Sequence, residues 1–330
     1  MPDTPLPIPP PIEDLSVKLD APERPLVTVV GPTGSGKSEL ALRLAEEFSG
    51  EIVNCDSLQV FRHFDIGTAK LPPAARRGIA HHLIDIADPD RLFTAGEYAR
   101  LSRQAIAGIS ARGRLPIVAG GTGFYLRALL EGLFAGPSRD PDLRLRLGAR
   151  ETRRPGSLHR LLKRFDSEAA GRIHPHDVPK VTRAMEVCLL TRRPVSQLFR
   201  EGRDALTGYR VLKLGLLPDR DALYERLDAR CEAMFAGGLI EELRGILALG
   251  FAPSAKPFES HGYKQALQCL SGELNLHNAI FYARRNTRNY AKRQLTWFRR
   301  EPGLEWLKGF GDSAAVCDRA VALVRAFLHG

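Results

Sequence analysis

One stretch near the N-terminus has the residue types and the spacing of a phosphate-binding loop. The pattern G-x-x-x-x-G-K-[ST] is matched in full by Gly31, Pro32, Thr33, Gly34, Ser35, Gly36, Lys37 and Ser38. The glycines let backbone N–H groups close around phosphate oxygens, Lys37 reaches terminal phosphates, and the Ser38 hydroxyl can ligate Mg²⁺. This segment, called the phosphate loop below, predicts a phosphate compound as ligand and Mg²⁺ as cofactor.

An acidic residue follows the next apolar segment. Residues 51–55 are expected to form a strand, and Asp56 stands at its carboxyl end. In open α/β sheets this edge lines the binding crevice. A carboxylate there can organise a metal ion or act as a base, or it can simply stabilise a loop. Asp56 is therefore a candidate catalytic residue.

Positive charge is concentrated in parts of the chain. The 330 residues carry a formal net charge of +10, with a pI near 9.6. Residues 139–204 hold 16 Lys/Arg against 9 Asp/Glu, a net of +7, and residues 277–300 hold seven Lys/Arg and no acid. Such local excess favours a polyanionic partner. In residues 277–300 aromatic residues are interleaved with the cations, so we expect a helix with aromatics mostly in the core and cations facing nucleic acid.

A further group of arginines follows an expected strand at residues 211–217. Arg220 and Arg226 are six residues apart on one expected helix, and Arg230 lies a turn further along. They either reach a diphosphate from above or pair on the surface with Asp221, Glu225 and Asp228, and spacing alone favours the surface pairing.

The elements that position these residues alternate between strands and helices. Strands are expected at residues 26–30, 51–55, 81–86, 115–119 and 211–217. Helices are expected at residues 39–48 and 97–112, and a second glycine-rich turn at 120–125 opens a helix that runs to Leu130. This alternation predicts an α/β fold with a parallel, doubly wound sheet.

Residues 137–205 have a different character, because strand-like runs give way to arginine-rich helical patterns. We expect a small all-helical domain inserted into a core made of residues 25–136 and 206–330. The core ends in helices expected at residues 219–235, 239–248, 260–269, 274–300 and 313–327. Residues 1–24 are proline-rich and are expected to form a disordered tail.

Composition narrows the class of protein. Hydrophobic residues make up 44% and charged residues 26%, as is usual for a soluble globular protein. There is no apolar run long enough for a transmembrane helix. The cysteines are scattered without a CxxC pair, which argues against zinc or a disulfide framework: Cys55, Cys188, Cys231, Cys269 and Cys317. We expect a cytoplasmic protein that acts as a monomer.

Several stretches together resemble one family, the tRNA dimethylallyltransferases (tRNA isopentenylpyrophosphate transferases, or IPP transferases). The matching stretches are GPTGSGKS at 31–38, DSLQVFRHFDIGTAK at 56–70, HHLID at 81–85, GGTGFYLRALL at 120–130, IHPHDVPKVTRAMEV at 173–187, SHGYKQ at 260–265 and TRNYAKRQLTWFRR at 287–300. The resemblance spans residues 26 to about 308. The combination is specific, whereas the phosphate loop alone would not be.

The resemblance implies a P-loop NTPase-like core with a parallel sheet flanked by helices, plus an inserted helical domain. It implies transfer of a dimethylallyl group from dimethylallyl diphosphate to N6 of adenosine 37 in tRNA. The phosphate loop would then hold a leaving group rather than ATP, with Mg²⁺ offsetting its charge. Asp56 matches the family's catalytic aspartate, which would accept the N6 hydrogen.

The resemblance also implies roles for further residues. Thr122 matches a threonine that contacts the tRNA or the diphosphate, and Arg220 matches a position that touches the diphosphate. Together with Asp56 and Thr122, the extruded adenine and its neighbours would be held by Ser57, Leu58 and Gln59. Candidate tRNA contacts are Arg144, Lys180 and Arg183 in the insertion, and in the long helix Arg284, Arg285, Arg288, Lys292 and Arg293.

The chain departs from the family pattern at a few positions. Ser38 stands where threonine is usual, and either hydroxyl can ligate Mg²⁺. His176 and Lys180 replace an expected asparagine and arginine, which weakens the inferred tRNA contact there because lysine lacks arginine's bidentate geometry. The C-terminal zinc-finger cysteines of eukaryotic relatives are absent, which favours a bacterial-type enzyme.

Three alternatives stay open from sequence. A phosphate-loop kinase for small molecules would consume ATP. An adenylate isopentenyltransferase would prenylate free AMP or ATP, although the basic insertion and the long basic helix are unnecessary for a mononucleotide. A non-catalytic RNA-binding module would leave the phosphate loop without a purpose.

Overall fold

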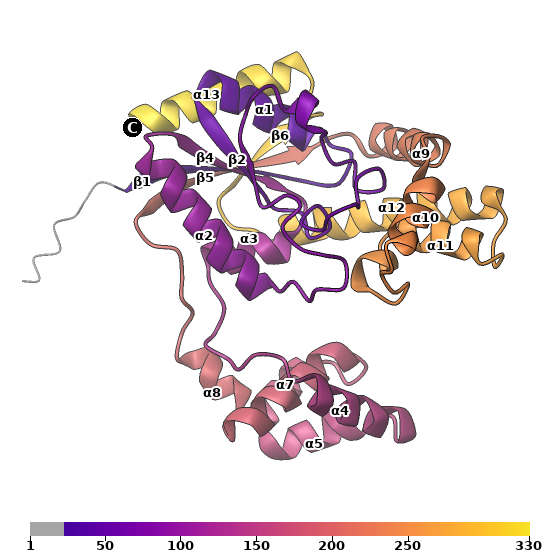
Figure 1. Cartoon of the computed structure of the whole chain (residues 1–330). Helices are drawn as coiled ribbons and strands as arrows, with labels where there is room; N and C mark the ends of the chain where they lie inside the picture. The colour runs from indigo at the N-terminus through magenta and orange to yellow at the C-terminus, as the bar shows by residue number, and fades with distance from the viewer. Residues whose placement is uncertain (1–22) are drawn as a thin grey trace, which may run out of the picture.

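The computed structural model describes residues 23–330, and its centre is a parallel sheet of six strands (Figure 1). The strands are β1 (Arg24–Val30), β2 (Gly50–Asn54), β3 (His81–His82), β4 (Leu115–Gly120), β5 (Tyr209–Leu217) and β6 (Leu304–Lys308). They are ordered β3-β2-β4-β1-β5-β6, and every pairing is parallel. The loops that follow the strands therefore meet at one edge of the sheet.

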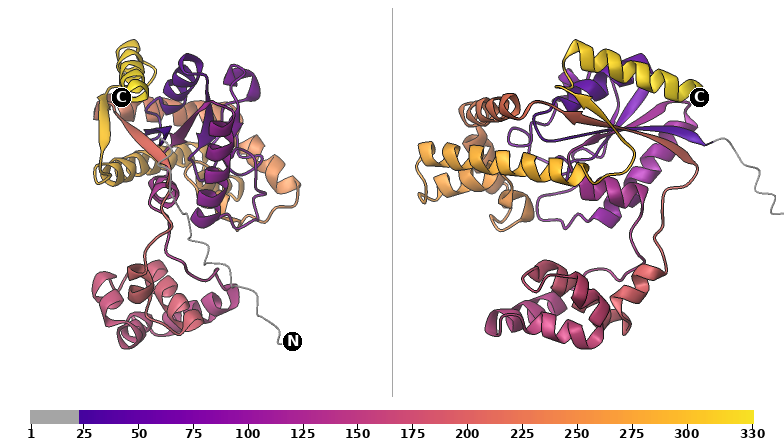
Figure 2. Two further views of the ribbon diagram at one scale, coloured as in Figure 1. Left: turned by 90° about the vertical axis from the view of Figure 1, so that its left-hand side faces the viewer. Right: turned by 180° about the vertical axis from the view of Figure 1, so that it is seen from behind.

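The side chains of the central strand alternate between two apolar layers. Val27 and Val29 of β1 belong to the same core cluster as the apolar side chains of α1 (Lys37–Glu47) and α13 (Ala314–His329). Leu26 and Val30 belong to the core on the opposite face, which is covered by α2 (Ala95–Ala111), α3 (Gly123–Leu130) and α12 (Leu276–Phe298). Figure 2 shows helices on both sides of the sheet, which explains why β1 is apolar on both faces.

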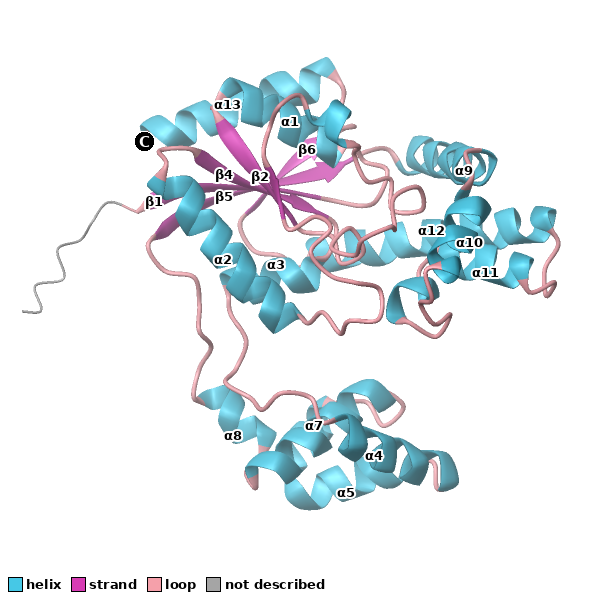
Figure 3. Cartoon of the chain, viewed as in Figure 1, coloured by secondary structure: helices cyan, strands magenta, loops and turns pink. Residues whose placement is uncertain are grey.

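A group of helices stands beyond the carboxyl edge of the sheet (Figure 3). It consists of α9 (Arg220–Ala236), α10 (Leu239–Ala248), α11 (Tyr263–Leu270) and most of the long helix α12. Leu223 and Leu227 of α9 pack with Ala291 of α12 in a small buried cluster. These helices provide the second wall of the crevice that opens at the ends of the strands.

The helices between β4 and β5 form a separate bundle. They are α4 (Pro141–Arg153), α5 (Ser157–Phe165), α6 (Ser167–Arg172), α7 (Val178–Thr191) and α8 (Val195–Arg200). Their apolar side chains form a core cluster of their own that includes Leu158, Leu162 and Met185. Two extended segments connect the bundle to the sheet (Figure 1). All five helices fall inside residues 137–205, which the sequence predicts to be a helical insertion.

The α/β fold with a parallel sheet flanked by helices is confirmed, but several boundaries differ from the prediction. The strand expected at residues 81–86 is only two residues long, because Leu83 and Asp85 have positive φ angles of 62° and 56°. The strand β6 was not predicted. The tail expected over residues 1–24 falls almost entirely outside the described residues, and β1 already begins at Arg24. None of the helices in residues 23–330 has the length and apolar character needed to cross a membrane.

Candidate active site

The phosphate loop connects β1 to α1 at the carboxyl edge of the sheet. Gly34 and Gly36 have positive φ angles of 77° and 86°, which let the chain turn tightly into the first turn of α1. A Cβ on Gly34 would lie 2.7 Å from Leu227 of α9, and one on Gly36 would lie 2.8 Å from the backbone nitrogen of Gly311. Neighbouring elements therefore leave no room for a side chain at either glycine.

Lys37 is a partly buried cation that lacks a full counter-charge in its surroundings. Its Nζ donates to the carbonyl oxygen of Pro32 at 2.7 Å, so the side chain curls back over the phosphate loop. The walls of the cavity exclude most water from the half-buried ammonium, and this desolvation lowers the pKa of Lys37 to about 8 against the smaller opposing effect of Asp56. A phosphate group would restore the missing counter-charge.

Asp56 and Thr122 meet at the ends of β2 and β4. The Asp56 carboxylate accepts from the backbone N–H of Leu58 at 2.8 Å, which orients it at the start of the loop. Thr122 Oγ1 accepts from the N–H of Ser57 at 3.0 Å and donates to the Ser57 hydroxyl at 3.3 Å. The second glycine-rich turn is thus hydrogen-bonded, through Thr122, to the loop after β2 that carries Asp56.

Gln294 of α12 ties the phosphate loop to the second glycine-rich turn, and it was not singled out from sequence. Its Oε1 accepts from the N–H of Thr33 at 2.8 Å, and its Nε2 donates to the carbonyl of Gly121 at 2.8 Å. The helical spacing of α12 places Gln294 on the same buried stripe as Ala291 and Phe298. A polar residue on a buried helical stripe was the signal that could have identified it.

An open cavity of about 740 Å³ lies over the phosphate loop. It is lined by Lys37, Ser38, Asp56, Arg226 and Arg230, among others. Burial lowers the pKa of Arg230, whose guanidinium thus faces the cavity in a partly dehydrated state. The cations and the loop N–H groups make this a site for a strongly anionic ligand.

The structure places Arg220 elsewhere. It is the first residue of α9, its side chain is 75% exposed, and its Nε lies 3.3 Å from Asp221. It does not line either cavity next to Asp56 in the described part of the chain. Arg226 and Arg230, which the sequence also places on this helix, do line the cavity over the phosphate loop, and the diphosphate contact of Arg220 stays a prediction. Residues 226 and 230 are four apart and share a face of α9, whereas Arg220 is the first residue of the helix.

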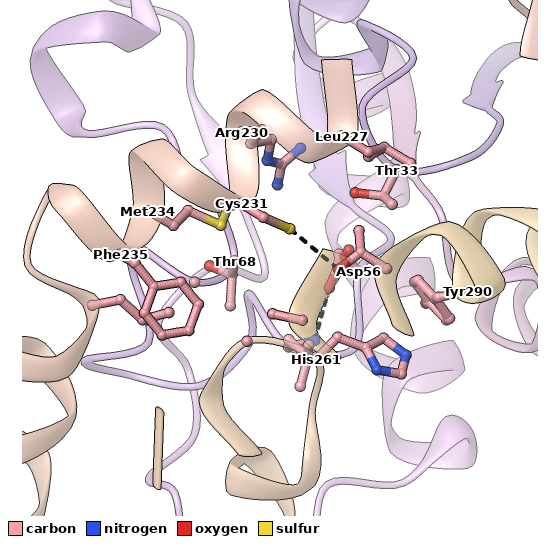
Figure 4. A pocket seen from close by; sticks show the side chains of 16 residues that line it. Thr33, Asp56, Thr68, Leu227, Arg230, Cys231, Met234, Phe235, His261 and Tyr290 are labelled. Carbon is pink, nitrogen blue, oxygen red and sulfur yellow. Dashed lines mark hydrogen bonds between the residues drawn. The ribbon is translucent and has the colours of Figure 1, made fainter. Parts of the chain in front are cut away.

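A narrower, mainly apolar cavity continues from Asp56 between α9 and α12 (Figure 4). Its apolar wall is formed by Leu58, Leu227, Met234, Phe235, Leu239 and Ala283. In Figure 4 Asp56 lies between Arg230 and Thr33 on one side and Tyr290 and His261 on the other. Burial, with a smaller effect from Asp56, raises the pKa of Tyr290, so its hydroxyl keeps its proton. Asp56 and Arg230 line both cavities, which therefore meet at these residues.

The cations predicted along α12 fall into two groups. Arg284 forms an ion pair with Glu232, and Arg288 lies 3.4 Å from Asp228, so both tie α12 to α9. Arg285 stacks over Tyr282 at 4.9 Å. Lys292 and Arg293, by contrast, line a surface groove that also contains Arg127, Thr296, Trp297 and Arg300. The cations in the N-terminal half of α12 are thus paired with other side chains of the protein, whereas those in its C-terminal half face solvent.

The cations predicted in the insertion are also partly committed to internal pairs. Arg144 and Arg183 both bind the buried carboxylate of Glu186, at 3.1 and 2.7 Å. Lys180 pairs with Asp177 at the start of α7 and remains largely exposed. Arg144 thereby links α4 to α7, whereas Arg183 pairs within α7 and donates to the carbonyl of Pro137, and neither structural role was expected from sequence.

A magnesium ion fits this site only with help from a ligand. Ser38 lines the cavity with its hydroxyl, and residues 23–330 contain no cluster of three or more His, Cys, Asp or Glu side chains that could hold a metal alone. Mg²⁺ commonly takes one or two protein ligands and completes its shell with phosphate oxygens and water. The donor set is therefore compatible with Mg²⁺ bound together with a diphosphate.

Comparisons with known proteins agree with the geometry. The model of the IPP transferase family matches residues 59–301. A tRNA dimethylallyltransferase from Solibacter usitatus (strain Ellin6076) is 73% identical over 304 residues, covering 92% of this chain and 99% of the relative. One from Koribacter versatilis (strain Ellin345) is 52% identical over 301 residues, covering 91% and 98%.

Solved structures give the same result. The full-length tRNA isopentenylpyrophosphate transferase from Bacillus halodurans is 35% identical, with a TM-score of 0.68 and coverage of 93% of this chain and 96% of that one. A eukaryotic dimethylallyltransferase acting on tRNA is 28% identical, with a TM-score of 0.79 and coverage of 93% and 80%. The phosphate loop, the aspartate beside it and these similarities together show that the chain belongs to the IPP transferase family.

Proposed function

We propose that the protein transfers the dimethylallyl group of dimethylallyl diphosphate to N6 of adenosine 37 in tRNA. The observation that carries this proposal is the position of Asp56, which lines both the anionic-ligand cavity and the apolar cavity. A prenyl diphosphate needs a cationic site for the diphosphate on one side of its C1 atom and an apolar site for the hydrocarbon chain on the other side. The diphosphate fits the phosphate loop, and the five-carbon chain fits the wall around Met234 and Phe235.

The reaction forms one bond and breaks one. The N6 atom attacks C1 of the prenyl chain, the C1–O bond breaks, and its electron pair leaves with the diphosphate. Asp56 accepts the hydrogen that N6 loses and orients the amine, which is otherwise a poor nucleophile. Lys37, Arg230 and the loop N–H groups stabilise the negative charge that grows on the leaving diphosphate. When Mg²⁺ is bound through Ser38 it supplies further charge neutralisation at the diphosphate.

The acceptor must be extruded from the anticodon loop to reach Asp56. Tyr290 and His261 line the cavity on the side away from the phosphate loop, with their rings 5.1 Å apart. Leu58 lines the same cavity, Thr122 binds Ser57 at the ends of β4 and β2, and Gln59 lines the phosphate-loop cavity. These residues are proposed to hold the adenine and its neighbours, as the family resemblance implies.

The tRNA backbone is proposed to follow the groove at the C-terminal half of α12. Arg127 lies 4.5 Å from the ring centre of Trp297, and Arg293 donates to His261 at 3.3 Å, so the groove leads to the Asp56 cavity. Lys292, Arg293 and Arg300 add positive charge along it. In the insertion, Lys180, Arg144 and Arg183 are proposed to contact the tRNA backbone. Lys180 is the most exposed of the three, and Arg144 and Arg183 remain partly exposed while they pair with Glu186.

The test is incubation with dimethylallyl diphosphate, Mg²⁺ and unmodified tRNA, followed by mass spectrometry of the digested nucleosides. We expect isopentenyladenosine from the wild type and none from Asp56→Ala, with no ATP required. Digests without isopentenyladenosine would refute the proposal. ATP consumption would point to a kinase, and prenylation of free AMP or ATP in preference to tRNA would point to an adenylate isopentenyltransferase.

The proposal also includes a cellular compartment and an oligomeric state. All five cysteines are free thiols in the structure, which supports a reducing cytoplasm. We further propose that the protein acts as a monomer, because the phosphate loop, Asp56 and Arg230 of one chain already line two connected cavities. Sedimentation of the active protein at micromolar concentration tests this, and a stable dimer would contradict it.

A further inference from the structure

The outer wall of the phosphate-loop cavity contains an ion pair that the mechanism above does not use. Arg226 of α9 and Asp312, in the loop between β6 and α13, both line this cavity. Nη1 of Arg226 donates to Oδ1 of Asp312 at 3.1 Å, and Nη2 donates to Oδ2. The guanidinium also lies 4.8 Å from the ring centre of Phe310. Contacts in two directions fix the guanidinium in space.

Asp312 stands directly against the phosphate loop. The N–H of the preceding residue, Gly311, donates to the carbonyl of Ser35 at 2.8 Å. A Cβ on Gly36 would lie 2.9 Å from the backbone nitrogen of Asp312 and 3.2 Å from its Oδ1. The carboxylate is therefore next to the N–H groups that receive phosphate, where an unpaired negative charge would repel a diphosphate. Pairing with Arg226 removes that repulsion.

Arg226 retains hydrogen-bond donors while it is paired. A guanidinium has five N–H groups, and end-on pairing with a carboxylate uses one from each Nη. Three donors remain, and the side chain is 41% exposed on the cavity side of α9. Arg226 can therefore contact a diphosphate without leaving Asp312. The pair also links α9 to the β6–α13 loop across the open side of the cavity.

We propose that Arg226 binds the diphosphate group of the donor and that Asp312 is the positioning residue that holds Arg226 in reach of it. This rests on the proposed function, because it takes a diphosphate as the ligand of the phosphate loop. In this arrangement Asp312 favours diphosphate binding because it positions Arg226. Its negative charge alone would instead weaken diphosphate binding by repulsion.

Calorimetric titration of the full chain with inorganic diphosphate and Mg²⁺, without tRNA, tests the inference. Asp312→Asn is expected to weaken diphosphate binding about tenfold, because asparagine cannot hold the guanidinium with two charge-assisted hydrogen bonds. Arg226→Ala should weaken binding at least as much, and the double variant should be no weaker than Arg226→Ala. Glu47→Gln, which breaks a surface pair with Arg325 at the far end of α1, is the matched control and should bind as the wild type does.

Two results would overturn the inference. Tighter diphosphate binding by Asp312→Asn would show that the carboxylate acts only through its charge. Additive losses in the double variant would show that the two residues act independently. Arg226→Lys keeps the charge and the fold but not the paired geometry, and it should reproduce the loss seen with Asp312→Asn.

Kinetics separate this inference from the proposed function. Asp312→Asn should raise the KM for dimethylallyl diphosphate and leave the KM for tRNA unchanged. An active enzyme in which Asp312→Asn changes neither diphosphate binding nor the donor KM would refute the inference alone. A wild type that binds diphosphate, with the predicted losses in the variants, but never prenylates tRNA would refute the proposed function and uphold the role of Asp312.

Discussion

Replacing Gln294 is a direct test of how the site is held together. Its amide bridges the Thr33 N–H and the Gly121 carbonyl, at 2.8 Å each, in the interior of the protein. In Gln294→Ala both backbone groups lose their partner. A buried polar group without a partner costs about 1–3 kcal/mol, so the free energy of unfolding should fall by about 2–6 kcal/mol. Because Thr33 belongs to the phosphate loop, diphosphate affinity should fall as well.

A glutamate at this position separates the two hydrogen bonds. Gln294→Glu can still accept from Thr33 but has no donor for Gly121, so it should keep the loop contact and lose the link to α3. Gln268→Ala, on the surface of α11, is the matched control. Urea unfolding followed by tryptophan fluorescence, with Trp297 close to the substitution, gives the stability. Diphosphate titration gives the affinity.

The reasoning would be refuted by a Gln294→Ala protein that unfolds at the wild-type urea concentration and binds diphosphate normally. Such a result would mean that water or a neighbouring side chain satisfies Thr33 and Gly121 as well as glutamine does. A loss of stability with unchanged diphosphate affinity would confine the role of Gln294 to the packing of α12.

Three other predictions concern single residues. Asp56→Asn should slow single-turnover transfer about 10²–10⁴-fold while tRNA still binds in a filter assay, and equal losses of both would contradict a base role. Because the pKa of Lys37 is lowered to about 8, the ammonium loses its proton as pH rises past that value, and diphosphate affinity should fall with it; constant affinity from mildly acidic to alkaline pH would contradict this. Glu186→Gln should destabilise the α4–α8 bundle by about 2 kcal/mol and increase its proteolysis without changing diphosphate binding, and unaltered proteolysis would exclude a structural role for Glu186.

The sequence predicted most of the sheet because its strands are apolar on both faces. The phosphate loop and the strand before it are local features, so β1 and α1 were placed within a few residues. The edge strands were harder to predict. The segment 304–308 mixes charged and apolar residues, and its partner β5 precedes it by about ninety residues along the chain. The segment after His82 is turned out of strand geometry by its positive φ angles.

The site was predictable where one segment supplies it and less so where helices from distant parts of the chain converge. The phosphate loop, Asp56 and Thr122 follow strands directly, so their common edge follows from parallel topology. Which arginine of α9 enters the cavity depends on the rotation of that helix, and spacing alone could not fix it. The same holds for Gln294, whose partners are 261 and 173 residues away.

The points where the insertion leaves and rejoins the core bear on how the family could diversify. The N–H of Leu206 donates to the carbonyl of Leu130 at 2.9 Å, and Arg103 binds the backbone on both sides, at Leu129 and Asp204. A unit whose two ends already touch can be gained, lost or exchanged in one genetic event, because a short turn closes the gap and leaves strand pairing intact. The inserted helices, which are proposed to contact tRNA, can therefore change in evolution independently of the chemistry at the edge of the sheet.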